Sequence, residues 1–101
     1  MDKPILYRYK FDEDSGSLES ESVEDYSEVI WFGKKEFRYK LLGTLRIVKE
    51  SNLDKYIYGQ VHSFDPDEEH AKQVIRNLLK AKYTKAYDEA QKYKQILERM
   101  S

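Results

Sequence analysis

Two histidines and a nearby aspartate are the residues of this sequence best suited to metal or acid–base chemistry. His62, Asp65 and His70 lie within nine residues of one another. A metal site needs imidazole and carboxylate side chains that converge on one point. His62 falls on an expected strand, Asp65 precedes an expected helix and His70 lies inside that helix, so nothing in the spacing makes them converge. We therefore predict no metal site and no cofactor, and capping or surface roles for the three residues.

Other catalytic signatures are absent from the sequence. It has no glycine-rich phosphate loop, no G-x-S-x-G nucleophile elbow and no H-E-x-x-H pair. Segment 66–72, PDEEHAK, superficially matches the nuclease pattern P-D…(D/E)-x-K, but two residues instead of one separate its last acid from Lys72. The absence of cysteine excludes disulfides, thiolate metal sites and a cysteine nucleophile. These observations predict that the protein is not an enzyme.

Acidic residues are concentrated in segment 12–28, which has eight carboxylates and neither Lys nor Arg. A disordered tether, a solvated hairpin face and a surface that imitates nucleic-acid phosphates would all have this composition. Leu18, Val23 and Tyr26 recur within the tract, which favours a strand or hairpin arm anchored by these three side chains. We call the tract the acidic arm, and we predict that it presents five carboxylates to solvent: Glu19, Glu21, Glu24, Asp25 and Glu28.

Two interpretations of the acidic arm stay open. Carboxylates on one face of a strand repeat every ~6.6 Å, which is close to the phosphate spacing along one nucleic-acid strand. Such a surface could occupy the basic groove of a nucleic-acid enzyme. A solvated edge that discourages pairing between sheets would have the same composition.

Basic residues are concentrated elsewhere, although the net charge is only −1. Segment 33–49 has six basic residues and one acid, and Lys72, Arg76 and Lys80 recur every four residues. On a helix this basic ridge is either a solvated face or a contact to an acidic partner, which could include the chain's own acidic arm. Exposed ion pairs of this kind contribute about 1 kcal/mol or less each.

Aromatic and basic residues alternate in segments 7–11 (YRYKF) and 37–40 (FRYK). Single-strand nucleic-acid binders stack bases on sheet aromatics and hold phosphates with nearby Lys and Arg. Tyr7, Tyr9, Phe37 and Tyr39 are the candidate stacking residues. Alternation places the aromatic and basic groups on opposite faces of each strand, however, and one face must become the core. We therefore favour a structural role for the four rings.

The periodicities predict an α+β fold with one domain over residues 1–101. Residues 1–64 are expected to form a small antiparallel sheet of four to five strands, and residues 65–101 one long helix. The first strand covers residues 5–11, and Leu45 and Ile47 continue the alternation of the strand around Phe37. Segment 56–64 is the last expected strand. No run of ~18 apolar residues and no signal-peptide core occur, so a cytoplasmic location is expected.

The helix start is the clearest local signal. Asp65 is the expected N-cap, Pro66 the first helical residue and Glu68 the third residue after the cap. No Gly or Pro follows Pro66, so the helix can continue for some 35 residues, or ~50 Å. A compact domain of this length is only ~35 Å across, so the helix must kink or project.

The later part of the helix has apolar residues at alternating gaps of four and three, as in a coiled-coil seam. Packing on the chain's own sheet and association with a second copy both explain this pattern. The seam consists of Leu79, Tyr83, Ala86, Ala90, Tyr93, Leu97 and Met100.

Three stretches resemble small accessory proteins of phages and mobile elements of Gram-positive bacteria. They are residues 7–16 (YRYKFDEDSG), residues 52–72 (NLDKYIYGQVHSFDPDEEHAK) and the Lys-, Glu- and Tyr-rich helical end. The resemblance implies non-enzymatic functions, such as blocking a host defence nuclease as anti-CRISPR proteins do, sequestering a signalling nucleotide or modulating a host complex.

From this we predict a phage-encoded inhibitor that binds a host protein stoichiometrically, for example a nucleic-acid-binding enzyme. The acidic arm or the helix would make the contact. One alternative is a homodimeric scaffold protein that associates through the helix. The other is a binder of single-stranded nucleic acid or of a nucleotide, which the alternation pattern disfavours.

Overall fold

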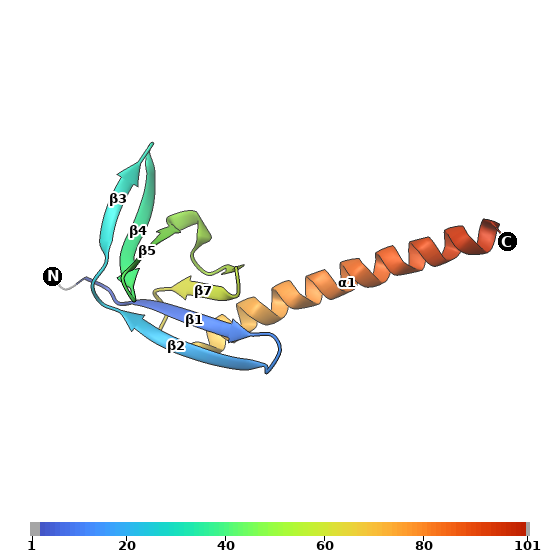
Figure 1. Ribbon diagram of the computed structural model, residues 1–101, viewed down its shortest axis with the longest axis horizontal. Helices are drawn as coiled ribbons and strands as arrows, with labels where there is room; N and C mark the ends of the chain where they lie inside the picture. The colour runs from blue at the N-terminus through green and yellow to red at the C-terminus, as the bar shows by residue number, and fades with distance from the viewer. Residues whose placement is uncertain (1–2, 101) are drawn as a thin grey trace.

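Two antiparallel sheets and one long helix make up the protein (Figure 1). The structure is a computed structural model that describes residues 3–100. Its strands are β1 (Leu6–Asp12), β2 (Ser17–Val23), β3 (Ser27–Trp31), β4 (Lys34–Leu41), β5 (Thr44–Lys49), β6 (Tyr56–Ile57) and β7 (Gln60–Ser63). A short 3-10 helix η1 (Glu50–Asn52) follows β5, and helix α1 (Glu68–Met100) ends the described chain. The predicted α+β class is confirmed.

The strands divide over two sheets, where we expected one. The first sheet has the order β2-β1-β7-β6 and the second the order β3-β4-β5. The chain leaves the first sheet after Val23 and enters the second at Ser27, and Val23 and Tyr26 are both buried at this corner. They join a core cluster that both sheets share, with Leu6, Phe37, Tyr39 and Val48. The sheets separate at this corner because two of the three anchors of the acidic arm, Val23 and Tyr26, point into this common core.

A second core cluster joins the first sheet to the start of the helix. It consists of Tyr9 and Val61 on the sheet and Ala71 and Ile75 on α1, which are at most 2% exposed. The Tyr9 hydroxyl donates a hydrogen bond to the backbone carbonyl of Asp65 at 2.7 Å. This cluster therefore fixes both the position of α1 and the loop that leads into it.

Three hairpin turns place a bulky residue directly before a glycine. Phe32, Leu42 and Tyr58 have φ angles of 50°, 51° and 51°, and the following glycines also have positive φ. Positive φ at both central residues is the signature of a type I′ turn, which matches the twist of a two-residue hairpin. The turn at Tyr58 divides the strand expected over residues 56–64 into β6 and β7. That expected single strand was wrong because we did not recognise Tyr58–Gly59 as a turn.

The turn at Leu42 also sets which face of β5 is buried. It pairs Leu41 with Thr44, so Phe37 lies opposite Val48 and Arg38 lies opposite Ile47. Val48 is consequently buried, whereas Leu45 and Ile47 are 53% and 51% exposed. Leu45 and Ile47 therefore lie on the face of Arg38 rather than on that of Phe37.

Replacing Leu42 with asparagine is expected to raise the free energy of unfolding by about 0.5–1 kcal/mol. A bulky side chain is disfavoured in the left-handed region, whereas Asn tolerates it. Leu42 is 98% exposed, so little packing is lost. Urea denaturation measures the change, and Leu45→Asn on the neighbouring extended strand is the control. A lower stability of Leu42→Asn than of wild type would contradict this account of the turn.

The helix begins later than expected. Asp67 is the N-cap, since its Oδ1 accepts a hydrogen bond from the backbone N–H of Glu69 at 3.0 Å. Asp65 instead accepts a hydrogen bond from the N–H of Asp67 at 2.9 Å. The predictions of Asp65 as the cap and of Pro66 as the first helical residue were therefore wrong. Because Asp65 and Pro66 form a turn that supports the Tyr9 hydrogen bond, helical geometry starts only at Glu68.

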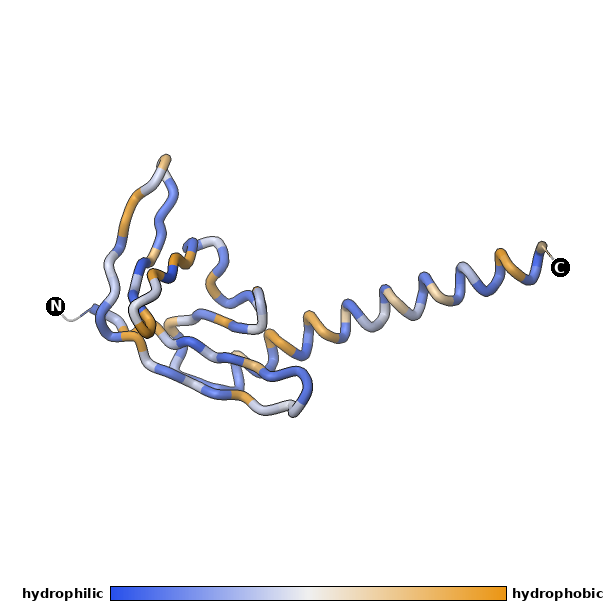
Figure 2. Tube along the Cα trace, in the orientation of Figure 1, coloured by the Kyte–Doolittle hydropathy of each residue, from blue (hydrophilic) through white to orange (hydrophobic). Residues whose placement is uncertain are grey.

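The helix does not kink but projects beyond the β-sheets (Figure 1). The molecule measures 68 × 34 × 25 Å, and the long dimension comes from α1. Hydrophobic residues recur along the helix as far as its outer end (Figure 2). One unbroken helix therefore carries apolar side chains well away from either core.

Candidate functional site

The outer part of α1 is a long apolar surface that the fold leaves uncovered. Ala71 and Ile75 are the buried residues of the helix, and they lie in its first two turns. From Lys80 to Met100 every residue except Gln91 is classed as exposed. At 1.5 Å per residue this projecting helix, residues 80–100, is a rod of roughly 30 Å.

Six of the seven predicted seam residues lie on the projecting helix. Tyr83, Tyr93, Leu97 and Met100 are 73%, 65%, 65% and 79% exposed, and both alanines are exposed as well. Leu79 differs, because it packs against the second core cluster. The interpretation in which the seam packs on the chain's own sheet is therefore wrong beyond Leu79.

Two further apolar residues widen this face. Tyr87 and Ile96 are 55% and 41% exposed, and they flank the seam. The sequence analysis missed both because it followed only the strict alternation of four and three. A broader stripe of apolar residues, as found on helices that cover a neighbour, would have included them. We call Tyr83, Ala86, Tyr87, Ala90, Tyr93, Ile96, Leu97 and Met100 the apolar helix face.

The acidic arm lies where it was expected but is partly neutralised. Its five predicted carboxylates are exposed on β2, on the corner and on β3, and Val23 and Tyr26 anchor the arm. However, β1 pairs with β2 so that Arg8 lies opposite Glu21 and Lys10 opposite Glu19. Arg8 forms an ion pair with Glu21 at 3.2 Å. The arm is therefore less negative in the fold than along the sequence.

The basic ridge borders a groove between α1 and the β1–β2 hairpin. Lys72 and Arg76 line this groove of about 400 Å³ together with Phe11, Leu18 and Leu79. The ammonium of Lys72 lies 3.2 Å from a carboxylate oxygen of Glu69. Arg76 and Lys80 are exposed. The ridge is thus a solvated edge of the helix next to its docked part.

His62 points toward the second sheet and away from His70. Its Nε2 lies 2.7 Å from the hydroxyl of Tyr39, across the space between the two sheets. Burial, together with the smaller effect of the positive charges of Arg8 and Arg46, lowers the pKa of His62 to about 4. Burial also raises the pKa of Tyr39, so a neutral phenol is hydrogen-bonded to a neutral imidazole at pH 7.

His70 forms a separate cluster at the start of α1. Its Nε2 lies 2.8 Å from Asp54 Oδ1, and its Nδ1 lies 4.0 Å from Asp65 Oδ2. Ser63 donates to the same Asp54 oxygen at 2.5 Å. Asp65 and His70 thus approach each other more closely than expected, while His62 stays apart. Within residues 3–100, no group of three His, Asp or Glu side chains is arranged to hold a metal ion.

The four candidate stacking rings are not available to bases. Tyr9, Phe37 and Tyr39 are 1%, 2% and 4% exposed, and Tyr7 is half-buried. They pack in the two core clusters, as the structural interpretation expected.

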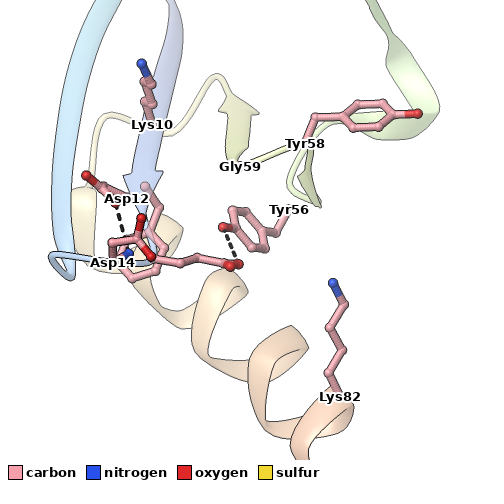
Figure 3. A pocket seen from close by; sticks show the side chains of 9 residues that line it. Lys10, Asp12, Asp14, Tyr56, Tyr58, Gly59 and Lys82 are labelled. Atoms are coloured by element: carbon pink, nitrogen blue, oxygen red, sulfur yellow. Dashed lines mark hydrogen bonds between the residues drawn. The ribbon is translucent and has the colours of Figure 1, made fainter.

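A shallow pocket of about 670 Å³ marks the point where α1 leaves the sheets (Figure 3). Asp12 at the end of β1 and Asp14 in the turn that follows lie on one side, and Lys82 extends toward the pocket from α1. Glu13 also lines the pocket. Tyr56 donates a hydrogen bond to Glu13 at 2.9 Å, and burial together with this carboxylate raises the pKa of Tyr56 to about 12. The hydrogen bond between Tyr56 and Glu13 connects β6 to the β1–β2 turn and is of the kind that orders a turn.

Comparison with known proteins found no matching family, curated protein or solved structure. Within the part of the chain that the structure describes, no helix combines the length and the hydropathy needed to cross a bilayer.

Proposed function

We propose that this chain is a non-enzymatic binding protein that acts by stoichiometric association through the projecting helix. The two sheets form a body that holds the first turns of α1, and the apolar helix face contacts a helix of another protein. The chain would either hold that partner next to its own two sheets or cover a binding surface of the partner.

The observation that carries the proposal is the exposure of the apolar helix face. Six large apolar side chains on it are between 41% and 79% exposed over roughly 30 Å of helix. Helices in water owe most of their stability to packing of an apolar face, and isolated segments of this length are marginal. Contiguous exposed apolar patches also mark interaction sites. A partner helix would remove this face from water and stabilise the rod.

The acidic arm supports the proposal less strongly. Ion pairing with Arg8 and the neighbouring Lys10 reduce its resemblance to a row of phosphates. Binding of a host protein by a phage-encoded inhibitor, the more specific hypothesis, is compatible with association through the helix and stays a prediction. Its natural contact surface is the apolar helix face rather than Glu19 and Glu21.

A photo-crosslinking residue at position 93 tests the proposal in cells that express the chain. Benzoylphenylalanine in place of Tyr93 is expected to give a covalent adduct of higher mass, because this position lies within the apolar helix face. The same residue in place of Gln95, on the opposite side of the helix, is the matched control. No adduct from position 93, or equal adducts from both positions, would overturn the proposal.

A further inference from the structure

We propose that the partner of the apolar helix face is a second copy of this chain, packed antiparallel so that Ala90 of each copy faces Tyr93 of the other. This inference rests on the proposed function and names its partner. It follows from the order of side-chain sizes along the projecting helix. In the resulting dimer, the β-sheets of the two copies would lie at opposite ends of a pair of helices.

Side-chain size determines the direction. In an antiparallel pair, the two kinds of seam position face each other, so one register aligns each of the six seam residues on the projecting helix with a seam residue of the second copy. In that register an alanine always faces a large residue, except in the outermost layers, where a tyrosine faces a methionine. The layers are Tyr83 with Met100, Ala86 with Leu97 and Ala90 with Tyr93, each occurring twice by symmetry.

A parallel pair would instead place each residue opposite itself. Tyr93 would face Tyr93 and Ala90 would face Ala90, so the required separation of the helices would change sharply along the seam. Helix separation depends on the side chains at the contact, and two straight helices hold a nearly constant distance. The antiparallel register gives nearly equal layers at its four central positions and is therefore the better packed arrangement.

The area available is sufficient for a dimer. If each of the six large side chains loses roughly 100 Å² of accessible surface, two copies bury about 1,200 Å². Stable protein interfaces bury about 1,200–2,000 Å² in total. The estimate lies at the lower limit, so we expect a dimer that dissociates measurably at micromolar concentration.

Sedimentation of the full chain over micromolar to submillimolar concentrations tests the dimer. The mass is expected to rise toward twice the chain mass of 12.1 kDa. Tyr93→Glu should weaken dimerisation at least about tenfold, because it removes a central aromatic side chain from both copies and places an unpaired carboxylate in the apolar interface. Gln95→Glu adds the same charge on the opposite side of the helix and should leave the dimer unchanged. A monomer at every concentration, or equal effects of the two variants, would overturn the inference.

Cysteine pairing tests the direction, because the chain has no cysteine of its own. Ala86→Cys and Leu97→Cys proteins are expected to form disulfides when mixed and not when oxidised separately. In a parallel pair positions 86 and 97 of opposite chains are roughly 16 Å apart, too far for a disulfide. Self-linked dimers of each variant alone, without mixed ones, would overturn the antiparallel arrangement.

The crosslinking experiment separates this inference from the proposed function. An adduct at position 93 with twice the chain mass supports both. An adduct of any other mass supports association through the helix and overturns self-association.

Discussion

Replacing Tyr9 with alanine is expected to lower the free energy of unfolding by about 3–5 kcal/mol, the usual cost of removing a buried aromatic side chain. Tyr9 is 1% exposed and packs with Val61, Ala71 and Ile75. Its removal leaves a cavity between the first sheet and α1 that neither element can close alone. Domains of this size have only about 5–15 kcal/mol of stability, so the variant should unfold at much lower urea concentration.

Tyr9→Phe separates the ring from the hydroxyl. It keeps the packing and removes only the hydrogen bond to the carbonyl of Asp65, so we expect a loss of about 1 kcal/mol. Equal losses for Phe and Ala would contradict the view that the ring holds α1 on the sheet. Urea denaturation followed by circular dichroism measures both variants.

The second large effect is a loss of stability in acid caused by His62. Its pKa is 6.5 in an unfolded chain and about 4 in the folded protein. Folding therefore favours the neutral imidazole, and the stabilisation is complete above pH 6.5. As pH falls from 6.5 to about 4, the unfolded chain binds a proton that the folded protein excludes. The free energy of unfolding is expected to fall by about 3 kcal/mol over this range.

His62→Gln is the variant that isolates this effect. The glutamine amide can still form a hydrogen bond with the Tyr39 hydroxyl, but it does not titrate. The free energy of unfolding of the variant should therefore change much less between pH 7 and pH 4. Asp12, whose pKa is lowered by hydrogen bonds from the backbone N–H groups of Asp14 and Ser15, loses its contribution only at lower pH. Urea denaturation at several pH values compares the variant with wild type. Parallel curves for the two proteins would show that His62 does not cause the acid sensitivity.

These two predictions concern the parts of the body that support the projecting helix. Tyr9 packs against the first turns of α1, and the hydrogen bond between His62 and Tyr39 connects the first sheet to the second. When both contacts are intact, the two sheets keep α1 in a fixed position and the apolar helix face extends into solvent. Substitutions on that face should change binding without unfolding the protein, because its residues are exposed and outside both cores.

Local patterns alone were sufficient for several features. The alternation of Tyr7, Tyr9 and Phe11 predicts a strand because successive side chains point to opposite faces, and β1 covers these residues. The absence of Gly and Pro after Pro66 predicts one long helix, and α1 runs unbroken to Met100. Length alone also predicts that the helix must kink or project, since it exceeds the expected diameter of the domain. The structure shows that it projects.

Other features depend on which segments pair, and tertiary structure decided them. Leu45 and Ile47 have the alternation of core residues, yet a two-residue turn places them on the same face as Arg38 and buries Val48 instead. The pairing of β1 with β2 likewise brings Arg8 to Glu21 and reduces the charge of the acidic arm. A one-residue change of register exchanges the two faces of a strand, so local sequence cannot specify either result.

The candidate binding surface divides in the same way. Its spacing of four and three is a property of the sequence by itself, because it needs only helical geometry to place these residues on one face. Whether the chain covers that face is a property of the fold. Tyr9 and Val61 hold only the first turns of α1, so the core ends near Leu79 and the apolar helix face beyond it stays in water. Helical periodicity is local, whereas burial depends on what the rest of the chain brings near.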